Sequence, residues 1–381
     1  MTKTIPPLVM GGAGFSYQLH PDPESLPIRQ ILLHAFEQGL CTIDTSPYYE
    51  PSEQLMGAAL SHIDITSKFS REDIVLMTKV GRIRENEFDY SPAWVRKSVA
   101  RSLERFRTSY MDVVFCHDVE FVSVEEAVVA VGVLFELRRA GVIRCVGISG
   151  YGIDNLAHIA KLVQQRYGKA LDAIQTWAQL TLQNTQVEQR GLDLFRAAGV
   201  TSILCSSPLA VGLLRNGGIP AGLTGDWHPA PHALRAAVQN AAEWVEQQGE
   251  TMASVSLRFA IAKATQSRGS GFSMSTIVGI STMSDLEKNI AAAKQILTVP
   301  GNEKAACKLD QFTELDETVF ALDQPLYDRV RTMLGQWVDY DFQGKQLGSK
   351  NSVNTTHVKQ RVTEARPFET EVVSQRIKPS L

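Results

Sequence analysis

The sequence lacks the features that mark several large classes of protein. No apolar run approaches the roughly 18 residues of a transmembrane helix. Residues 1–7 do not form a charged segment followed by an apolar core, so we expect no signal peptide. The net charge of −3 gives no reason to expect binding to nucleic acid or to an acidic membrane surface. We therefore expect a cytoplasmic location with no membrane or nucleic-acid partner, and the sequence leaves the oligomeric state open.

Cysteine is also scarce. The chain has five cysteines, an odd number, and none shows the paired spacing of zinc ligands. Four of them lie in apolar runs of the kind that form strands, where a reduced thiol behaves as a small apolar side chain. We therefore expect buried, reduced thiols and no metal site.

What the sequence does contain is an alternation of short β-branched runs and longer amphipathic stretches. The predicted strands are residues 8–11, 41–44, 74–79, 111–116, 143–149, 173–176, 202–206 and 276–280. The predicted helices that follow them are residues 27–38, 53–60, 93–106, 124–139, 153–166, 187–198, 231–248 and 284–297. Eight such units favour a closed (β/α)8 barrel, a TIM barrel, over an open sheet, for which no topological switch point is visible.

Two segments lie outside this count. Residues 252–263 have the pattern of an extra helix before the eighth strand. Residues 300–381 follow the last barrel helix, with a helix near 326–334 and a polar tail from 345 onward. We therefore divide the chain into a barrel over residues 1–299 and a C-terminal extension over residues 300–381, which packs on the barrel or trails from it.

Three chemically active side chains end successive predicted strands. Asp44, Lys79 and His117 close the second, third and fourth strands, and Tyr49 follows in the loop after the second. Each alone has an ordinary explanation, as a turn residue, a surface lysine or a core histidine. Together they would meet at the C-terminal rim of the barrel, where the active sites of such barrels lie. An acid, a base and a phenol in one place suit proton transfer at a carbonyl or an alcohol.

Two later loops suggest a phosphate site. Residues 206–214 follow the seventh strand and residues 279–282 follow the eighth, which is where barrels often bind phosphate groups. The alternative is ordinary turn chemistry and helix capping. Residues 11–14 (Gly-Gly-Ala-Gly) do not have the spacing of a dinucleotide fingerprint, so we interpret them as a tight turn that lets a ligand approach.

These motifs resemble those of the aldo-keto reductase superfamily. Residues 44–49 (Asp-Thr-Ser-Pro-Tyr-Tyr) look like its Asp-Thr-x-x-x-Tyr signature, and Lys79 and His117 match the rest of its catalytic tetrad. Residues 141–149, 207–214 and 279–289 are similar to its strand-five motif and cofactor loops, so the resemblance spans about residues 6–297. It implies an oxidoreductase that uses a nicotinamide cofactor, with Asp44, Tyr49, Lys79 and His117 as the catalytic residues.

The resemblance also assigns roles within the site. Tyr49 would exchange the proton, with its pKa lowered from about 10 by the Lys79 ammonium. Asp44 would keep Lys79 charged, and His117 would orient the substrate oxygen. The residues expected to contact the cofactor are Gly12, Gly14, Phe15, Ser149, Gln175, Ser207, Leu209, Gly212, Ser281, Asp285 and Asn289.

A narrower resemblance points to a substrate. Residues 78–82 and 117–121 look like the branch that contains fungal NAD-dependent D-arabinose 1-dehydrogenase and plant L-galactose dehydrogenase. It implies oxidation of an aldose such as D-arabinose, L-galactose or L-fucose at C1 to the aldonolactone. The residues expected to contact the sugar are Arg82, Asp118 and Trp177. Two departures from the family pattern are Glu50, where glycine is usual, and Gly150-Tyr151, where Asn-Phe or Asn-Tyr is common.

Other functions stay open. One is an aldehyde reductase that uses NADPH, for example on pyridoxal; another is a cofactor-binding regulatory subunit like the β-subunits of potassium channels. We expect NAD rather than NADP, because Asp285 stands where many NADP-binding relatives have arginine, and a carboxylate repels the 2′-phosphate. The ordinary explanation for Asp285 is that it caps the last barrel helix.

Overall fold

Eight parallel strands close into a barrel in the computed structural model, which describes residues 5–219, 228–269, 271–301 and 307–342. Around the barrel the order is β1, β2, β3, β6, β7, β8, β9 and β10, and β10 pairs with β1 to complete the circle. Their bounds are Leu8–Gly11, Thr42–Asp44, Val75–Val80, Met111–Cys116, Ile143–Gly150, Ala173–Trp177, Ser202–Ser206 and Ser273–Gly279. The predicted TIM barrel is confirmed.

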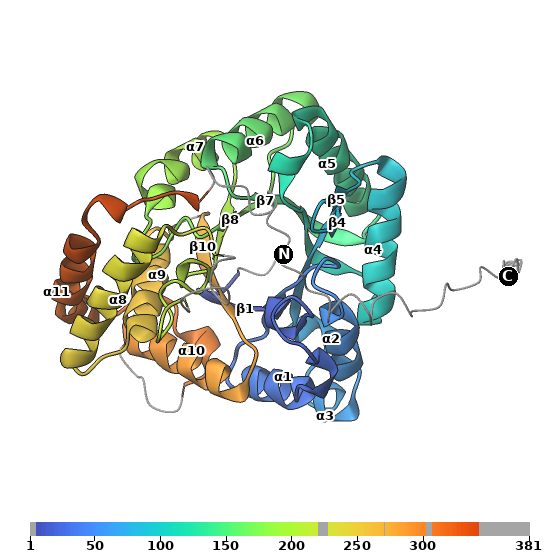
Figure 1. The fold of residues 1–381 in the computed structure, drawn as a ribbon. Helices are drawn as coiled ribbons and strands as arrows, with labels where there is room; N and C mark the ends of the chain where they lie inside the picture. The colour runs from blue at the N-terminus through green and yellow to red at the C-terminus, as the bar shows by residue number, and fades with distance from the viewer. Residues whose placement is uncertain (1–4, 220–227, 270, 302–306, 343–381) are drawn as a thin grey trace, which may run out of the picture. The chain divides into compact units, whose positions relative to one another are not determined.

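A ring of helices surrounds the strands (Figure 1). The helices that follow the strands are α1 (Ile28–Glu37), α2 (Ser52–Leu60), α4 (Pro92–Phe106), α5 (Val124–Arg139), α6 (Ile153–Tyr167), α7 (Leu192–Ala197), α8 (His232–Gln247) and α10 (Met283–Ile296). A short helix, α3 (Ile63–Thr66), follows α2, and one π-helical turn (Val187–Gly191) precedes α7. The extra helix before the eighth strand is present as α9 (Met252–Gln266).

Alternation along the strands divides the core into two layers. Val9, Met77, Phe115, Leu204 and Ile277 belong to a cluster that fills the barrel interior. Their strand neighbours belong to the larger cluster between the strands and the helices, among them Met10, Leu76, Val114, Ile203 and Val278. Because side chains alternate between the two faces of a strand, a polar residue at a strand's C-terminal end can project over the barrel while its neighbour packs outward.

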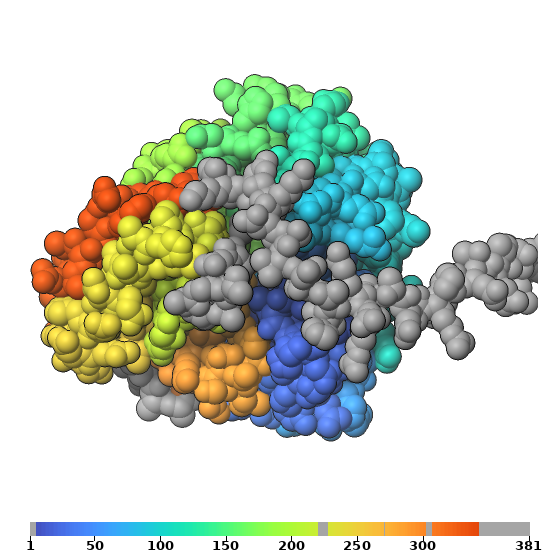
Figure 2. Space-filling view, in the orientation of Figure 1, coloured from blue at the N-terminus to red at the C-terminus, as the bar shows by residue number. Residues whose placement is uncertain are grey.

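The C-terminal helix α11 (Glu317–Leu334) lies beside α8 and α9, as the adjacent red and yellow surfaces in Figure 2 show for α11 and α8. Arg258 of α9 is fully buried, and its Nε donates to Asp323 Oδ2 of α11 at 2.6 Å. The Tyr327 hydroxyl donates to the same oxygen at 2.9 Å. This buried network makes α11 part of one compact unit with the barrel, residues 1–345.

Several predicted boundaries are wrong. Helix α11 begins at Glu317 rather than 326, because Asp316 caps it and Pro325 is tolerated inside it. Strand β10 begins at Ser273 rather than 276, where Ser273 Oγ lies 2.6 Å from Ser202 Oγ of β9. The hairpin of β4 (Arg82–Arg84) and β5 (Glu87–Phe88) was not predicted. The predicted tail lies outside the described residues, and the domain division at residue 299 stays a prediction.

Candidate active site

The ends of β2, β3 and β6 bring three of the predicted catalytic residues together. Asp44 is the last residue of β2, Lys79 is the penultimate residue of β3, and His117 follows β6 directly. Lys79 Nζ donates to Asp44 Oδ2 at 2.7 Å and to the Thr45 carbonyl oxygen at 3.0 Å. Both side chains are buried, so neither charge can turn away to water, and the pair fixes the ammonium in one place.

Tyr49 lies in the loop between β2 and α2, close to this ammonium. Lys79 Nζ is 5.2 Å from the centroid of the Tyr49 ring, and the His117 ring centroid lies 5.7 Å from the same point. Burial raises the pKa of Tyr49 well above 10, and the carboxylates of Asp118 and Asp44 raise it further. The lowering that we expected from Lys79 is therefore wrong as a net effect. Desolvation disfavours the phenolate, and Tyr49 is a neutral phenol at neutral pH.

His117 is held from two sides. Its Nδ1 lies within hydrogen-bond distance of the Ser46 hydroxyl oxygen, at 3.0 Å, and that oxygen accepts from the Tyr48 N–H at 3.1 Å. Its Nε2 lies 3.5 Å from Asp118 Oδ2. Burial lowers the pKa of His117 well below 6.5, and the cations Lys79 and Arg82 lower it further. The imidazole is thus neutral, with a fixed ring orientation. Sequence reasoning missed Ser46, although its hydroxyl falls within the Asp-Thr-x-x-x-Tyr motif.

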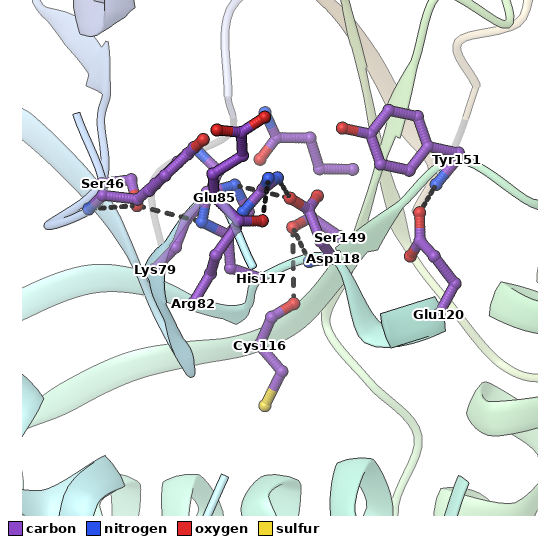
Figure 3. Close-up of polar contacts among 12 residues, drawn as sticks. Ser46, Lys79, Arg82, Glu85, Cys116, His117, Asp118, Glu120, Ser149 and Tyr151 are labelled. Atoms are coloured by element: carbon purple, nitrogen blue, oxygen red, sulfur yellow. Dashed lines mark hydrogen bonds and ion pairs between the residues drawn. The ribbon is translucent and has the colours of Figure 1, made fainter. Parts of the chain in front are cut away.

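Arg82 and Asp118, which we expected to bind the sugar, form an ion pair with each other (Figure 3). The Arg82 guanidinium also donates to the Glu85 carbonyl oxygen at 3.0 Å, and it lies over the Tyr48 ring at 4.1 Å from the centroid. Both side chains of the pair are 9% exposed. Burial raises the pKa of Asp118, and Arg82 opposes that shift. Arg82 is therefore largely engaged in holding Asp118 and the hairpin.

Trp177, the third predicted sugar contact, ends β8 and meets a residue that sequence analysis left without a role. The Tyr151 ring packs edge-on against the Trp177 ring with centroids 4.7 Å apart. Tyr151 follows the last residue of β7, and its backbone N–H donates to Glu120 Oε1 at 2.9 Å (Figure 3). Both aromatic residues are partly exposed at the rim.

The predicted cofactor contacts gather in four groups at the same rim. Gly12, Gly14 and Phe15 form a 3-10 turn after β1; Ser149 and Gln175 lie near the ends of β7 and β8. Ser207, Leu209 and Gly212 follow β9; Ser281 follows β10, and Asp285 and Asn289 lie on α10. Phe15 is fully buried in the core between the strands and the helices, so its side chain packs rather than facing a ligand.

One observation fits a nicotinamide cofactor. Gln175 Nε2 donates to Asp44 Oδ2 at 3.2 Å, while Gln175 Oε1 is buried without a hydrogen-bond partner among the described residues and can accept from a carboxamide N–H. A Cβ at Gly14 would overlap with the Ile280 carbonyl oxygen, so glycine lets the turn after β1 approach the end of β10 closely.

The loop after β9 has unusual backbone geometry. Ser207, Ala210 and Val211 have φ of +59°, +48° and +62°, a region that costs energy for residues with a Cβ and especially for valine. Ser207 Oγ accepts from the Val211 N–H at 2.9 Å, which stabilises the turn. Strain of this kind gathers at binding loops, which agrees with the predicted phosphate contact.

Asp285 acts as a helix cap. Its Oδ2 accepts from the Ser281 and Thr282 N–H groups at 3.1 and 2.9 Å, and its own N–H donates to Thr282 Oγ1 at 3.1 Å. This capping box is the ordinary explanation that we kept open, and it leaves one carboxylate oxygen at the start of α10. Asn289, one turn later, donates to the Gly279 carbonyl oxygen at 3.1 Å.

A model of the aldo/keto reductase family matches residues 7–300, which include the whole barrel. The chain belongs to the aldo/keto reductase family. It is therefore an oxidoreductase of a family that uses nicotinamide cofactors. The motif in residues 44–49 already predicted this family from the sequence. In the structure, neighbouring strand ends bring Asp44 of this motif next to Lys79.

The chain is similar to two sugar dehydrogenases along most of its length. It is 38% identical to D-arabinose 1-dehydrogenase of Saccharomyces cerevisiae and 30% identical to L-galactose dehydrogenase of Arabidopsis thaliana. Each match covers 74% of this chain and 82% of the relative. It is also 32% identical to an NADH-specific methylglyoxal reductase of Escherichia coli, over 48% of this chain and 56% of that protein.

The helices of the described residues were also compared with the length and apolarity that a bilayer requires. None of them is both long enough and apolar enough to cross a membrane.

Proposed function

We propose that this aldo/keto reductase oxidises an aldose of the D-arabinose, L-galactose or L-fucose type at C1 to the aldonolactone, with NAD. The observation that carries the proposal is the fixed Lys79 ammonium near the Tyr49 phenol, with a neutral His117 beside it. This arrangement suits removal of a proton from an alcohol. The similarity to the yeast and plant sugar dehydrogenases supports an aldose as the substrate.

Each member of the tetrad has a distinct task in this reaction. Tyr49, once ionised, accepts the proton of the anomeric hydroxyl, and the Lys79 ammonium stabilises the phenolate. Asp44 holds Lys79, and His117, neutral and fixed by Ser46 and Asp118, orients the substrate oxygen. The cofactor, when bound, accepts the hydride from C1. Ser149 and Gln175 would hold its carboxamide, and the loops after β9 and β10 its phosphates.

The preference for NAD rests on the start of α10. A carboxylate oxygen of Asp285 remains there, and among residues 281–289 the sequence has a single cation, Lys288. Asp285→Asn keeps an oxygen for the capping box and removes the charge, whereas Asp285→Arg removes the cap and adds a cation. We expect the ratio of kcat/KM with NADP to that with NAD to rise in Asp285→Asn and to rise further in Asp285→Arg. A wild-type preference for NADP would contradict the assignment.

Aldehyde reduction is the second candidate, and one observation favours it. The raised pKa of Tyr49 keeps the phenol protonated, which is the form that donates a proton to a carbonyl. The relative from Escherichia coli is named for such a reduction. A regulatory subunit that only binds the cofactor is the third candidate, and turnover at rates typical of enzymes would exclude it.

The deciding experiment is a substrate panel. D- and L-aldoses are tested with NAD and with NADP, and methylglyoxal, pyridoxal and butanal are tested with the reduced cofactors, following absorbance of the reduced form. We expect an aldose with NAD to give the highest kcat/KM, because the proton of the Tyr151 hydroxyl at the rim would lack an acceptor with an apolar aldehyde. Comparable efficiency on butanal would contradict the proposed substrate class.

A further inference from the structure

Tyr151 is a polar residue of the active-site rim that the tetrad chemistry does not use. Figure 3 shows its hydroxyl turned toward the side of the site that carries Arg82 and Asp118. The charges of Asp118 and Arg82 both act on the Tyr151 hydroxyl, and the Tyr151 hydroxyl in turn acts on Tyr49. The phenol of Tyr151 therefore lies within electrostatic range of the group that exchanges the proton.

The hydroxyl proton of Tyr151 is available to a ligand. Burial raises the pKa of Tyr151, so the group stays neutral and keeps its proton. The neighbouring Arg82 can only donate hydrogen bonds, so it leaves the Tyr151 oxygen in the accepting role. The Tyr151 hydroxyl oxygen accepts a hydrogen bond from the Arg82 side chain. The Tyr151 backbone N–H donates to Glu120, and its carbonyl oxygen accepts from Gln179 Nε2 at 3.2 Å.

The position of Tyr151 is set by a residue beneath it. Glu120 Oε1 accepts a hydrogen bond from the Tyr151 N–H. Glu120 Oε2 is buried next to Gly150 and has no hydrogen-bond partner in the part of the chain that the structure describes. A Cβ at residue 150 would overlap with Oε2, so the glycine that departs from the family pattern makes room for this carboxyl group. On the other side, Trp177 packs edge-on against the Tyr151 ring. The phenol is thus held by a backbone hydrogen bond and by a ring contact.

We propose that Tyr151 is a substrate-binding residue whose hydroxyl donates a hydrogen bond to one hydroxyl oxygen of the aldose, and that Glu120 is the residue that positions it. The inference rests on the proposed function, because it requires a polyhydroxylated substrate. It extends that function by naming a specificity residue directly after β7, away from the tetrad, which lies at or just after the ends of β2, β3 and β6.

The test compares the preferred aldose with its monodeoxy analogues in the wild type and in Tyr151→Phe, which keeps the ring against Trp177. Loss of one hydrogen bond should lower kcat/KM for the parent aldose about tenfold, mainly through KM. One deoxy analogue should be oxidised equally well by both proteins, because it already lacks the partner hydroxyl. Tyr167→Phe makes the same chemical change on α6, where the hydroxyl donates to the Val128 carbonyl oxygen, and should change nothing in kcat/KM.

Two variants test the positioning role of Glu120. Glu120→Gln keeps an oxygen for the Tyr151 N–H and should retain the wild-type KM near neutral pH. Glu120→Ala removes that oxygen and should raise KM for the parent aldose as Tyr151→Phe does, with a smaller effect on kcat. A KM in Glu120→Ala equal to that of the wild type would contradict the positioning role.

The outcomes separate this inference from the proposed function. If the wild type oxidises aldoses but Tyr151→Phe lowers kcat/KM equally for the parent and every deoxy analogue, or not at all, the role of Tyr151 is wrong while the function stands. If the wild type oxidises no aldose, the proposed function fails and this inference fails with it.

Discussion

Two buried pairs of a cation and a carboxylate lie at the same rim of the barrel, and they do different work. Lys79 and Asp44 come from the ends of neighbouring strands, and the ammonium lies near the Tyr49 phenol. Arg82 and Asp118 come from a hairpin and a short turn, and the guanidinium is covered by aromatic rings. In the proposed reaction, the first pair would set the protonation chemistry, whereas the second would shape the wall of the substrate site.

Breaking the first pair should have the larger effect. Lys79→Met removes the cation that stabilises the Tyr49 phenolate, so we expect kcat for aldose oxidation to fall by about 10²–10⁴-fold, the range typical of acid–base catalysis. It also leaves Asp44 as an unpaired buried charge, which costs about 3–5 kcal/mol of stability. The double variant Lys79→Met/Asp44→Asn should regain much of the stability, measured by urea unfolding, but not the activity. Activity near that of the wild type in the double variant would contradict the role of Lys79.

Breaking the second pair should act mainly on substrate binding. Arg82→Met leaves Asp118 without its cation and removes the guanidinium contacts to the Tyr48 ring and the hairpin. We expect kcat/KM to fall about ten- to a hundredfold, the effect typical of losing a hydrogen bond to a charged group. The loss should lie mostly in KM. Steady-state kinetics of Arg82→Met and Arg82→Lys provide the check. If kcat falls and KM is unchanged, the second pair belongs to the proton chemistry and the contrast between the pairs is wrong.

A third carboxyl, Glu120, sharpens the comparison because it is buried without a cation of its own. Burial and, to a smaller extent, the charge of the nearby Asp118 together raise the pKa of Glu120 from 4.5 to about 8. Between these pH values the folded state holds a proton that the unfolded state has lost, so this group lowers stability progressively as pH rises from 4.5 to about 8. Above about pH 8, the stability lost through Glu120 no longer changes with pH.

The Glu120→Gln variant lacks this titrating group. The other titratable groups contribute equally to the pH dependence of stability in the two proteins, so a difference between them reports on Glu120. We expect the Tm of Glu120→Gln to match the wild type near pH 4.5 and to exceed it by a margin that widens toward pH 8. Thermal unfolding at several pH values measures the difference. A difference in Tm that is the same at every pH would show that Glu120 does not titrate as described.

The two pairs also differ in how well the sequence predicted them. The strand pattern predicted the barrel, and strand order alone brings Asp44, Lys79 and His117 to one rim, because parallel strands end at the same edge. The pairing of Arg82 with Asp118 depends on a hairpin whose polar, irregular sequence carries no strand pattern. The pKa of Tyr49 depends on burial by residues far apart in the chain, so a single neighbouring lysine predicted the wrong direction. Tyr151 and Ser46 were not predicted as site residues, because their contacts in the site are not part of any sequence motif.

The central claim is that Tyr49, held neutral by burial and assisted by Lys79, is the base in aldose oxidation. The most direct test is the pH dependence of kcat/KM for the preferred aldose with NAD, in the wild type and in Tyr49→Phe. Because the pKa of Tyr49 lies well above 10, the wild-type rate should rise with pH through the neutral and mildly alkaline range, by about tenfold per unit where ionisation limits it. Tyr49→Phe should be at least about 10²-fold slower and should lack this rise. A Phe variant that keeps the wild-type rate and pH profile would contradict the account.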